Sequence, residues 1–254
     1  MSIKGDIREM MKALVVPVIF LVICWAVWLL DKNYHLYLYH YGVKPRTAWG
    51  ALGILFSPFI HDTHGYSHII NNSSAMIVLL WSLFYFYKDL AWKVFLVVWL
   101  GGGLWLWCLS RDSFHIGASG IIYGLASYLF FSGMFRKNIR LMSLSMIVVF
   151  LYGGMIWGVL PLDTTTGRFS MDLSISFEGH LWGAAVGLLI AYVYRKIGYE
   201  RKKYQWEIDE ELGIEPPDFE GELRRQEIAK ALAEQAAVEN QVHVTYTIKK
   251  KDDN

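Results

Sequence analysis

The feature that most constrains this chain is a series of six long apolar runs separated by more polar segments. A helix needs about 20 mostly apolar residues to cross the hydrocarbon core of a bilayer. The runs lie at about 13–30, 67–87, 94–110, 117–135, 141–160 and 179–194. Hydrophobic residues make up 54% of the chain, more than in an ordinary soluble domain. We therefore predict an all-α polytopic membrane protein with six transmembrane helices.

The distribution of positive charge predicts the orientation of these helices. Lysine and arginine gather before the first run, after the second, after the fourth and after the sixth. Cytoplasmic loops carry such an excess, so both termini are expected in the cytoplasm. The second, fourth and sixth helices then begin at the outer face. The compact six-span form suggests a bacterial inner membrane.

Composition divides the chain into three expected parts. Residues 1–12 form a cytoplasmic lead, residues 13–196 a membrane core, and residues 197–254 a cytoplasmic appendage. The appendage contains a helix-like stretch rich in Ala, Glu and Arg, interpreted as a solvated helix, with a helix that binds a cytoplasmic partner as the alternative. The sequence contains no nucleic-acid-binding motif, and no nucleic-acid partner is predicted.

Polar residues gather at the starts of the three helices that are expected to begin at the outer face. His68 and Asn72 open the second run, Ser119 opens the fourth, and His180 opens the sixth. Polar side chains inside membrane spans are costly and often functional. Because the three helices start on the same side, these residues are expected to lie at one depth.

Small residues predict that the fourth and sixth helices pack closely. Glycines recur at a spacing of four, at Gly120, Gly124, Gly179, Gly183 and Gly187, and such spacing lets membrane helices approach each other. Packing on these faces would bring Ser119 within reach of His180. A serine needs an adjacent base to act as a nucleophile, and a histidine supplies one near neutral pH.

The other histidines of this region raise the alternative of a metal site. His61, His64 and His68 are close in sequence, but no His-Glu-x-x-His pattern exists and no carboxylate lies in a nearby span. We therefore predict neither a metal nor a cofactor, and interpret His61 and His64 as interface or loop-anchoring residues. For His115, which precedes the serine, ordinary loop polarity is the default interpretation.

Three motifs together resemble the rhomboid family of intramembrane serine proteases. They are His68-x-x-x-Asn72, Gly117-Ala118-Ser119-Gly120, and His180 followed by Gly183 and Gly187. The order of these motifs and the helices that carry them match the family pattern, and the resemblance covers about residues 13–196.

The resemblance implies a role for each residue of the motifs. Ser119 would be the nucleophile and His180 the general base. His68 and Asn72 would form the oxyanion hole, and Tyr123 would pack on the catalytic histidine. Gly117, Gly120, Gly183 and Gly187 would support the site. The implied substrates are single-pass transmembrane proteins, admitted past the fifth span and the loop at 161–178.

Two alternatives and two departures accompany the resemblance. A catalytically silent relative that binds transmembrane helices is the main alternative; a transporter is disfavoured because no internal symmetry is visible. The family's first loop usually carries Trp-Arg, whereas Trp49 is followed here by Gly50. A second histidine usually precedes the oxyanion histidine by five residues, whereas His64 precedes it by four and His61 by seven.

Overall fold

The computed structural model describes part of the chain, in two compact units. The described residues are 3–137, 139, 142–143, 146–147, 176–197, 205–214, 218–239 and 246–249. The units are Met1–Arg201 and Lys202–Asn254, and each is described by itself. Most of the fifth predicted run, 141–160, and most of the predicted loop at 161–178 lie outside the described residues, and the predicted domain boundaries stay predictions.

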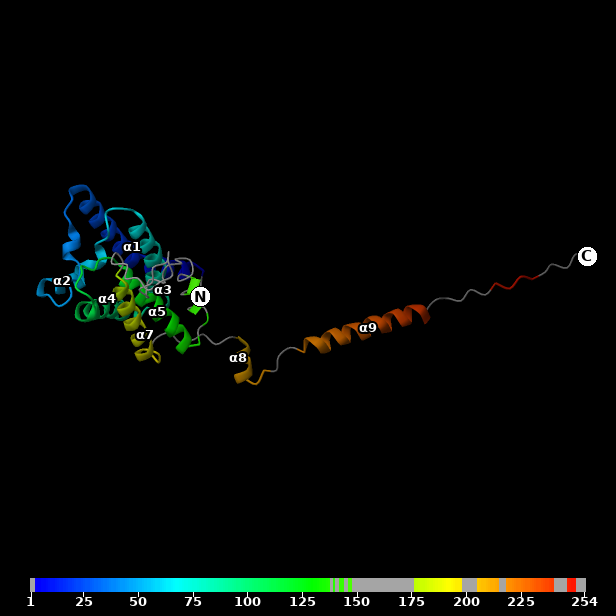
Figure 1. Ribbon diagram of the computed structural model, residues 1–254. Coiled ribbons are helices and arrows are strands. Elements are labelled where there is room, and N and C mark those ends of the chain that lie inside the picture. Colours follow the sequence, from blue (N-terminus) through cyan, green and yellow to red (C-terminus); the bar gives the residue numbers. More distant parts are fainter. Residues whose placement is uncertain are drawn as a thin grey trace, which may run out of the picture. The chain divides into compact units, whose positions relative to one another are not determined.

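The first unit is a bundle of helices (Figure 1). Its elements are α1 (Ile3–Tyr34), η1 (Leu38–Tyr41), α2 (Ala48–Phe56), η2 (Ser57–Phe59), α3 (Ser67–Phe86), α4 (Ala91–Leu109), α5 (Ser119–Phe135) and α7 (Phe177–Val193). Helices Ile7–Tyr34, Ser67–Phe86 and Ala91–Leu109 are long and apolar enough to cross a membrane, and α5 and α7 are shorter apolar helices. The prediction of a helical membrane bundle is confirmed for the described residues.

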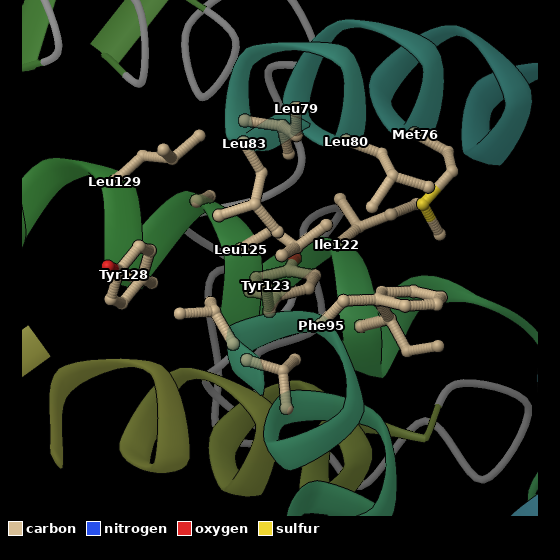
Figure 2. Close-up of a cluster of buried hydrophobic side chains, with 14 of the residues drawn as sticks. Met76, Leu79, Leu80, Leu83, Phe95, Ile122, Tyr123, Leu125, Tyr128 and Leu129 are labelled. Carbon is tan, nitrogen blue, oxygen red and sulfur yellow. The ribbon is translucent and has the colours of Figure 1, made fainter. Parts of the chain in front are cut away.

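The core of this unit lies where α5 meets α3 and α4. Figure 2 shows the side chains that meet there. They include Met76, Leu79, Leu80 and Leu83 from α3, Phe95 from α4, and Ile122, Leu125 and Leu129 from α5. Lipid is as apolar as these side chains, so close van der Waals packing rather than removal from water holds such a core together. This packing makes α5 the central helix of the unit.

The contact between α5 and α7 is a backbone contact. A Cβ atom built on Gly183 would overlap the carbonyl oxygen of Gly120, and one built on Gly187 would overlap that of Gly124. The hydroxyl of Ser127 on α5 also donates to the carbonyl of Ala184 on α7, at 2.8 Å. Any side chain at these glycines would therefore push the two helices apart.

The segment between α1 and α3 is anchored to the end of α4. The indole N–H of Trp107 donates to the carbonyl of Thr47 at 2.9 Å, and Nη1 of Arg46 donates to the carbonyl of Ser110 at 2.6 Å. At Gly50 a Cβ would overlap the backbone of Lys44, which explains why no larger residue follows Trp49. The guanidinium that anchors this segment to the end of α4 belongs to Arg46.

The second unit contains two described helices, α8 (Gln205–Glu211) and α9 (Phe219–Glu239). The start of α9 is capped by Asp218, whose Oδ1 accepts from the backbone N–H of Gly221 at 2.8 Å. The described side chains of α9 are almost all exposed. The predicted helix-like stretch is therefore helical, and its exposure agrees with a solvated helix within this unit.

The glycine contact between α5 and α7 predicts a sharp difference between two glycine-to-alanine substitutions. Gly183→Ala places a methyl group against the carbonyl of Gly120 and is expected to destabilise the protein by about 2 kcal/mol, as overpacking does. Gly101→Ala on α4 meets only Val186 and Val97 at 3.4 Å or more, so a change within about 0.5 kcal/mol is expected, as for substitutions away from such features. Thermal unfolding in detergent measures both; equal effects would contradict the backbone contact.

Candidate active site

Ser119 is the first residue of α5, and the turn before it requires glycine. Gly117 has φ +104°, a conformation that residues with a side chain rarely adopt. A Cβ on Gly117 would also lie 3.1 Å from Nε2 of His68. The backbone N–H of Gly117 donates to the carbonyl of Ser57 at 2.9 Å, which ties this turn to η2. The Gly-x-Ser motif thus sets the start of α5 beside α3.

His180 lies in the first turn of α7 and contacts Ser119 directly. Its Nε2 lies 2.8 Å from Oγ of Ser119. The imidazole ring stacks on the ring of Tyr123, with centroids 4.2 Å apart and an interplanar angle of 13°. Both rings are 9% exposed. The stack fixes the plane of the imidazole and aims Nε2 at the serine.

His68 and Asn72 face the same turn from α3. They are one helical turn apart, and the built Cβ of Gly117 would lie 3.6 Å from Nδ2 of Asn72. Asn72 is 8% exposed, and its Nδ2 has no hydrogen-bond partner among the described residues. The structure thus brings Ser119, His180, His68 and Asn72 together, with donors available beside the serine.

These four residues line one large cavity. Its volume is about 1650 Å³, and it extends from Ser119 and His180 to residues that follow α1, such as His35 and Tyr37. Polar side chains from α3 and from the loop before it line much of the wall. Among the described residues, no three His, Cys, Asp or Glu side chains are placed to hold a metal ion. The cavity adjoins Ser119 and is large enough to hold water molecules.

The structure separates the roles of His61 and His64. His61 is 3% exposed, and its ring centroid lies 5.2 Å from that of His68. The side chain of His64 is 94% exposed and pairs with Asp62 at 2.6 Å. His61 is therefore the buried histidine that packs against His68, despite its longer spacing in sequence.

Sequence reasoning missed two residues at the start of α7 that lie close to the site. Ser176 caps α7 and contacts His115, and Glu178 pairs with Arg111. The signal available in the sequence was a polar residue on each side of Phe177, within four positions of His180. Partners in a distant loop cannot be assigned from that signal alone.

Burial of His61 predicts a loss of stability in acid. Burial lowers the pKa of His61 to about 4, and the positive charge of His68 acts in the same direction, while the carbonyl of Phe59 opposes them. Because the folded-state pKa lies below the ordinary value of about 6.5, stability is full above pH 6.5 and falls as the pH drops towards 4. The shift from about 6.5 to about 4 corresponds to roughly 3 kcal/mol of folding free energy lost in acid, at about 1.4 kcal/mol per pKa unit.

Substituting His61 tests this assignment. His61→Phe keeps a ring against His68 but removes the titrating group, so unfolding measured between pH 7 and pH 4 should depend less on pH than in the wild type. Equal pH dependence in the two proteins would show that His61 is not the buried neutral group.

Comparisons with known proteins show which family the chain resembles. Residues 47–197 match the Rhomboid domain family. An uncharacterised protein of Mycobacterium tuberculosis strain H37Rv is 29% identical over 186 residues, which cover 68% of this chain and 72% of the relative. An uncharacterised protein of Mycobacterium leprae is 29% identical over 181 residues, which cover 68% of each chain. No solved structure matches the chain significantly. The match to the family spans more than half of the chain, which therefore belongs to the rhomboid family.

Proposed function

We propose that this protein is an intramembrane serine endopeptidase that hydrolyses peptide bonds in or next to transmembrane segments of membrane proteins. The observation that carries the proposal is the 2.8 Å contact between Nε2 of His180 and Oγ of Ser119 inside a large cavity. A nucleophile within hydrogen-bond distance of a base is the geometry that nucleophilic catalysis needs.

The first step is attack on the scissile carbonyl. Neutral His180 takes the hydroxyl proton of Ser119 on Nε2, and the serine oxygen bonds to the carbonyl carbon. The carbonyl oxygen becomes an oxyanion, which His68, Asn72 and the backbone N–H of Ser119 stabilise. Donors that are already in place at the developing charge lower the barrier most.

The second step releases the two products in turn. Protonated His180 gives its proton to the leaving amine, which departs as the first product and leaves an acyl-enzyme on Ser119. Water then attacks the ester with His180 again as base, and the acid product leaves. In this half-reaction His180 takes a proton from the water and gives it to Oγ of Ser119 as the ester bond breaks, so the serine hydroxyl and the neutral histidine are regenerated.

The substrate class follows from the membrane location of the site. Helix α5 has 17 residues, so it is about 25 Å long at 1.5 Å per residue, shorter than a hydrocarbon core of about 30 Å. We infer that Ser119 lies below the outer surface, in a wet cavity that opens outward. A substrate helix must unwind to present its carbonyl there, which favours helix-breaking residues near the bond and a small residue before it.

The proposed setting is a bacterial inner membrane with both termini in the cytoplasm. This orientation rests on the distribution of Lys and Arg. The appendage at 197–254 is proposed to be cytoplasmic, where α9 has a surface for a protein partner. Single-pass transmembrane proteins are the proposed substrates, because one helix with a polar flank can enter the cavity sideways from the lipid.

A silent family member that binds transmembrane helices is the second candidate function. The large cavity would also suit binding without cleavage. The contact between Ser119 and His180 favours the protease, because a binding protein has no need of a serine within 2.8 Å of a stacked histidine.

Removing either member of the dyad is expected to abolish cleavage. In proteoliposomes that contain labelled single-span substrates, Ser119→Ala and His180→Ala should each lower kcat by about 10⁴-fold or more, as loss of a nucleophile or its base does. Ser74→Ala is the matched control, since its hydroxyl donates to the carbonyl of Ile70 within α3. A folded Ser119→Ala protein that still cleaves would overturn the proposal, and binding without cleavage by the wild type would favour the silent member.

The oxyanion donors are expected to act on kcat more than on KM. Asn72→Ala should lower kcat by about 10²-fold or more, the usual cost of one donor, with KM little changed because the charge develops only in the transition state. Ser74→Ala, also on α3 but away from the residues that line the cavity, removes a hydroxyl that donates to the carbonyl of Ile70 and is expected to stay within about twofold, as a surface substitution does. Equal kinetics for the two variants would exclude Asn72 from the oxyanion hole.

A further inference from the structure

We propose that His115 and Ser176 position the general base by holding the first turn of α7, and that this hold is strongest with neutral His115. The inference rests on the proposed function, since it concerns the placement of His180 against Ser119. Neither residue touches the reacting atoms, and both act through the helix that carries the base.

Ser176 controls the backbone of His180. Its carbonyl oxygen accepts from the backbone N–H of Gly179 at 3.1 Å and from that of His180 at 3.4 Å. Its side-chain oxygen also accepts from the N–H of Gly179, at 3.3 Å. The first N–H groups of a helix lack partners within the helix, and a serine at the N-cap supplies one. The position of Ser176 therefore determines where the turn with His180 begins.

His115 holds Ser176 in place. Its Nδ1 lies 2.7 Å from Oγ of Ser176, and its Nε2 lies 3.3 Å from the carbonyl oxygen of Arg111. A carbonyl can only accept, so we assign the ring proton to Nε2. Nδ1 is then an acceptor, and the hydroxyl of Ser176 donates a hydrogen bond to it. With a neutral imidazole every donor in this chain, from Gly179 through Ser176 and His115 to Arg111, has an acceptor, whereas a protonated ring would itself donate to Oγ of Ser176 and leave the hydroxyl proton without one.

The loop that contains His115 is itself held firmly. His115 is 2% exposed, and its backbone N–H and carbonyl each pair with Val43 at 2.9 Å. Four residues later the same loop reaches Ser119. The short segment from His115 to Ser119 thus carries the nucleophile and, through the contact of His115 with Ser176, also holds the helix turn that carries the base.

A second contact joins the same two segments. Nε of Arg111 lies 3.3 Å from Oε1 of Glu178, which is 8% exposed. The guanidinium also lies over the ring of Phe177, 5.3 Å from its centroid. A carboxylate in the first turn of a helix is favoured by the helix dipole. The first turn of α7 is therefore tied to the loop at two neighbouring points, Ser176 and Glu178.

The contacts of His115 and Arg111 with the start of α7 can do for His180 what a third catalytic residue does in other serine proteases. In a Ser-His-Asp triad the carboxylate orients the imidazole. Here the stack on Tyr123 sets the plane of the ring, and the contacts from the loop before α5 fix the position of the first turn of α7 relative to Ser119. A displacement of about 1 Å in a reacting group costs up to about 10²-fold in rate, so a loose α7 terminus would lower kcat.

The groups around His115 favour its neutral form. Burial lowers its pKa; the carbonyl of Arg111 and the charge of Glu178 raise it, and the charges of Arg111 and Lys44 lower it. Because the folded-state pKa lies below the ordinary value, the bond to Ser176 contributes fully above about pH 6.5 and is lost as the pH falls through the folded-state pKa. Acid should therefore loosen the first turn of α7.

The test uses the full-length protein in proteoliposomes and a double-mutant cycle. His115→Phe and Ser176→Ala should each lower kcat by about tenfold with little change in KM, the size expected for a lost cap that shifts a reacting group. The double variant should be no worse than either single variant, because both remove the same bond. His115→Gln retains one acceptor and one donor and should restore activity to within about threefold of the wild type, as a conservative replacement of a hydrogen-bonding pair does.

A second readout does not depend on catalysis. In the Ser119→Ala background, hydrogen exchange at the amides of Gly179 and His180 should be faster when His115 is also replaced by Phe. In the protein that keeps His115, exchange at the same amides, corrected for the intrinsic rate, should become faster as the pH falls. Ser110→Ala is the matched control, because its buried hydroxyl has no hydrogen-bond partner among the described residues. Additive kinetic losses, or unchanged exchange at these amides, would overturn the positioning role. An inactive wild type whose amides still respond to His115→Phe would instead overturn the proposed protease function.

Discussion

The close approach of α5 and α7 is the contact on which the rest of the site depends. Gly120 and Gly124 on one helix face Gly183 and Gly187 on the other, with no room for a Cβ between them. A membrane interior offers no hydrophobic driving force between helices, so such backbone contact is a main source of association. It also brings the first turns of both helices together, and these turns carry Ser119 and His180.

Close packing alone leaves the ends of the two helices undetermined, and other contacts define them. Tyr123 fixes the plane of the imidazole from α5, and α3 brings His68 and Asn72 against the turn at Gly117. The loop before α5 reaches the start of α7 through His115 and Arg111. The pairing of Ser119 with His180 is thus supported by the apolar helices that carry the two residues and by loop contacts at the starts of those helices.

Much of this could be predicted from sequence because two signals are local. Apolar runs determine the helices, and glycines at a spacing of four mark the face on which two of them pack. Loop contacts were not predictable in this way. The guanidinium that anchors the first loop belongs to Arg46, and the histidine that packs on His68 is His61 rather than the nearer His64. Ser176 escaped notice because its partner, His115, lies 61 residues away.

The most direct test of the central claim is a structure of the protein in a lipid bilayer after reaction with a fluorophosphonate, which mimics the tetrahedral intermediate. We expect phosphorus bonded to Oγ of Ser119, with the phosphoryl oxygen within hydrogen-bond distance of His68 and Asn72 and with His180 still stacked on Tyr123. An unmodified Ser119, or a phosphoryl oxygen turned away from α3, would contradict the assignment of this cavity as the active site of a serine protease.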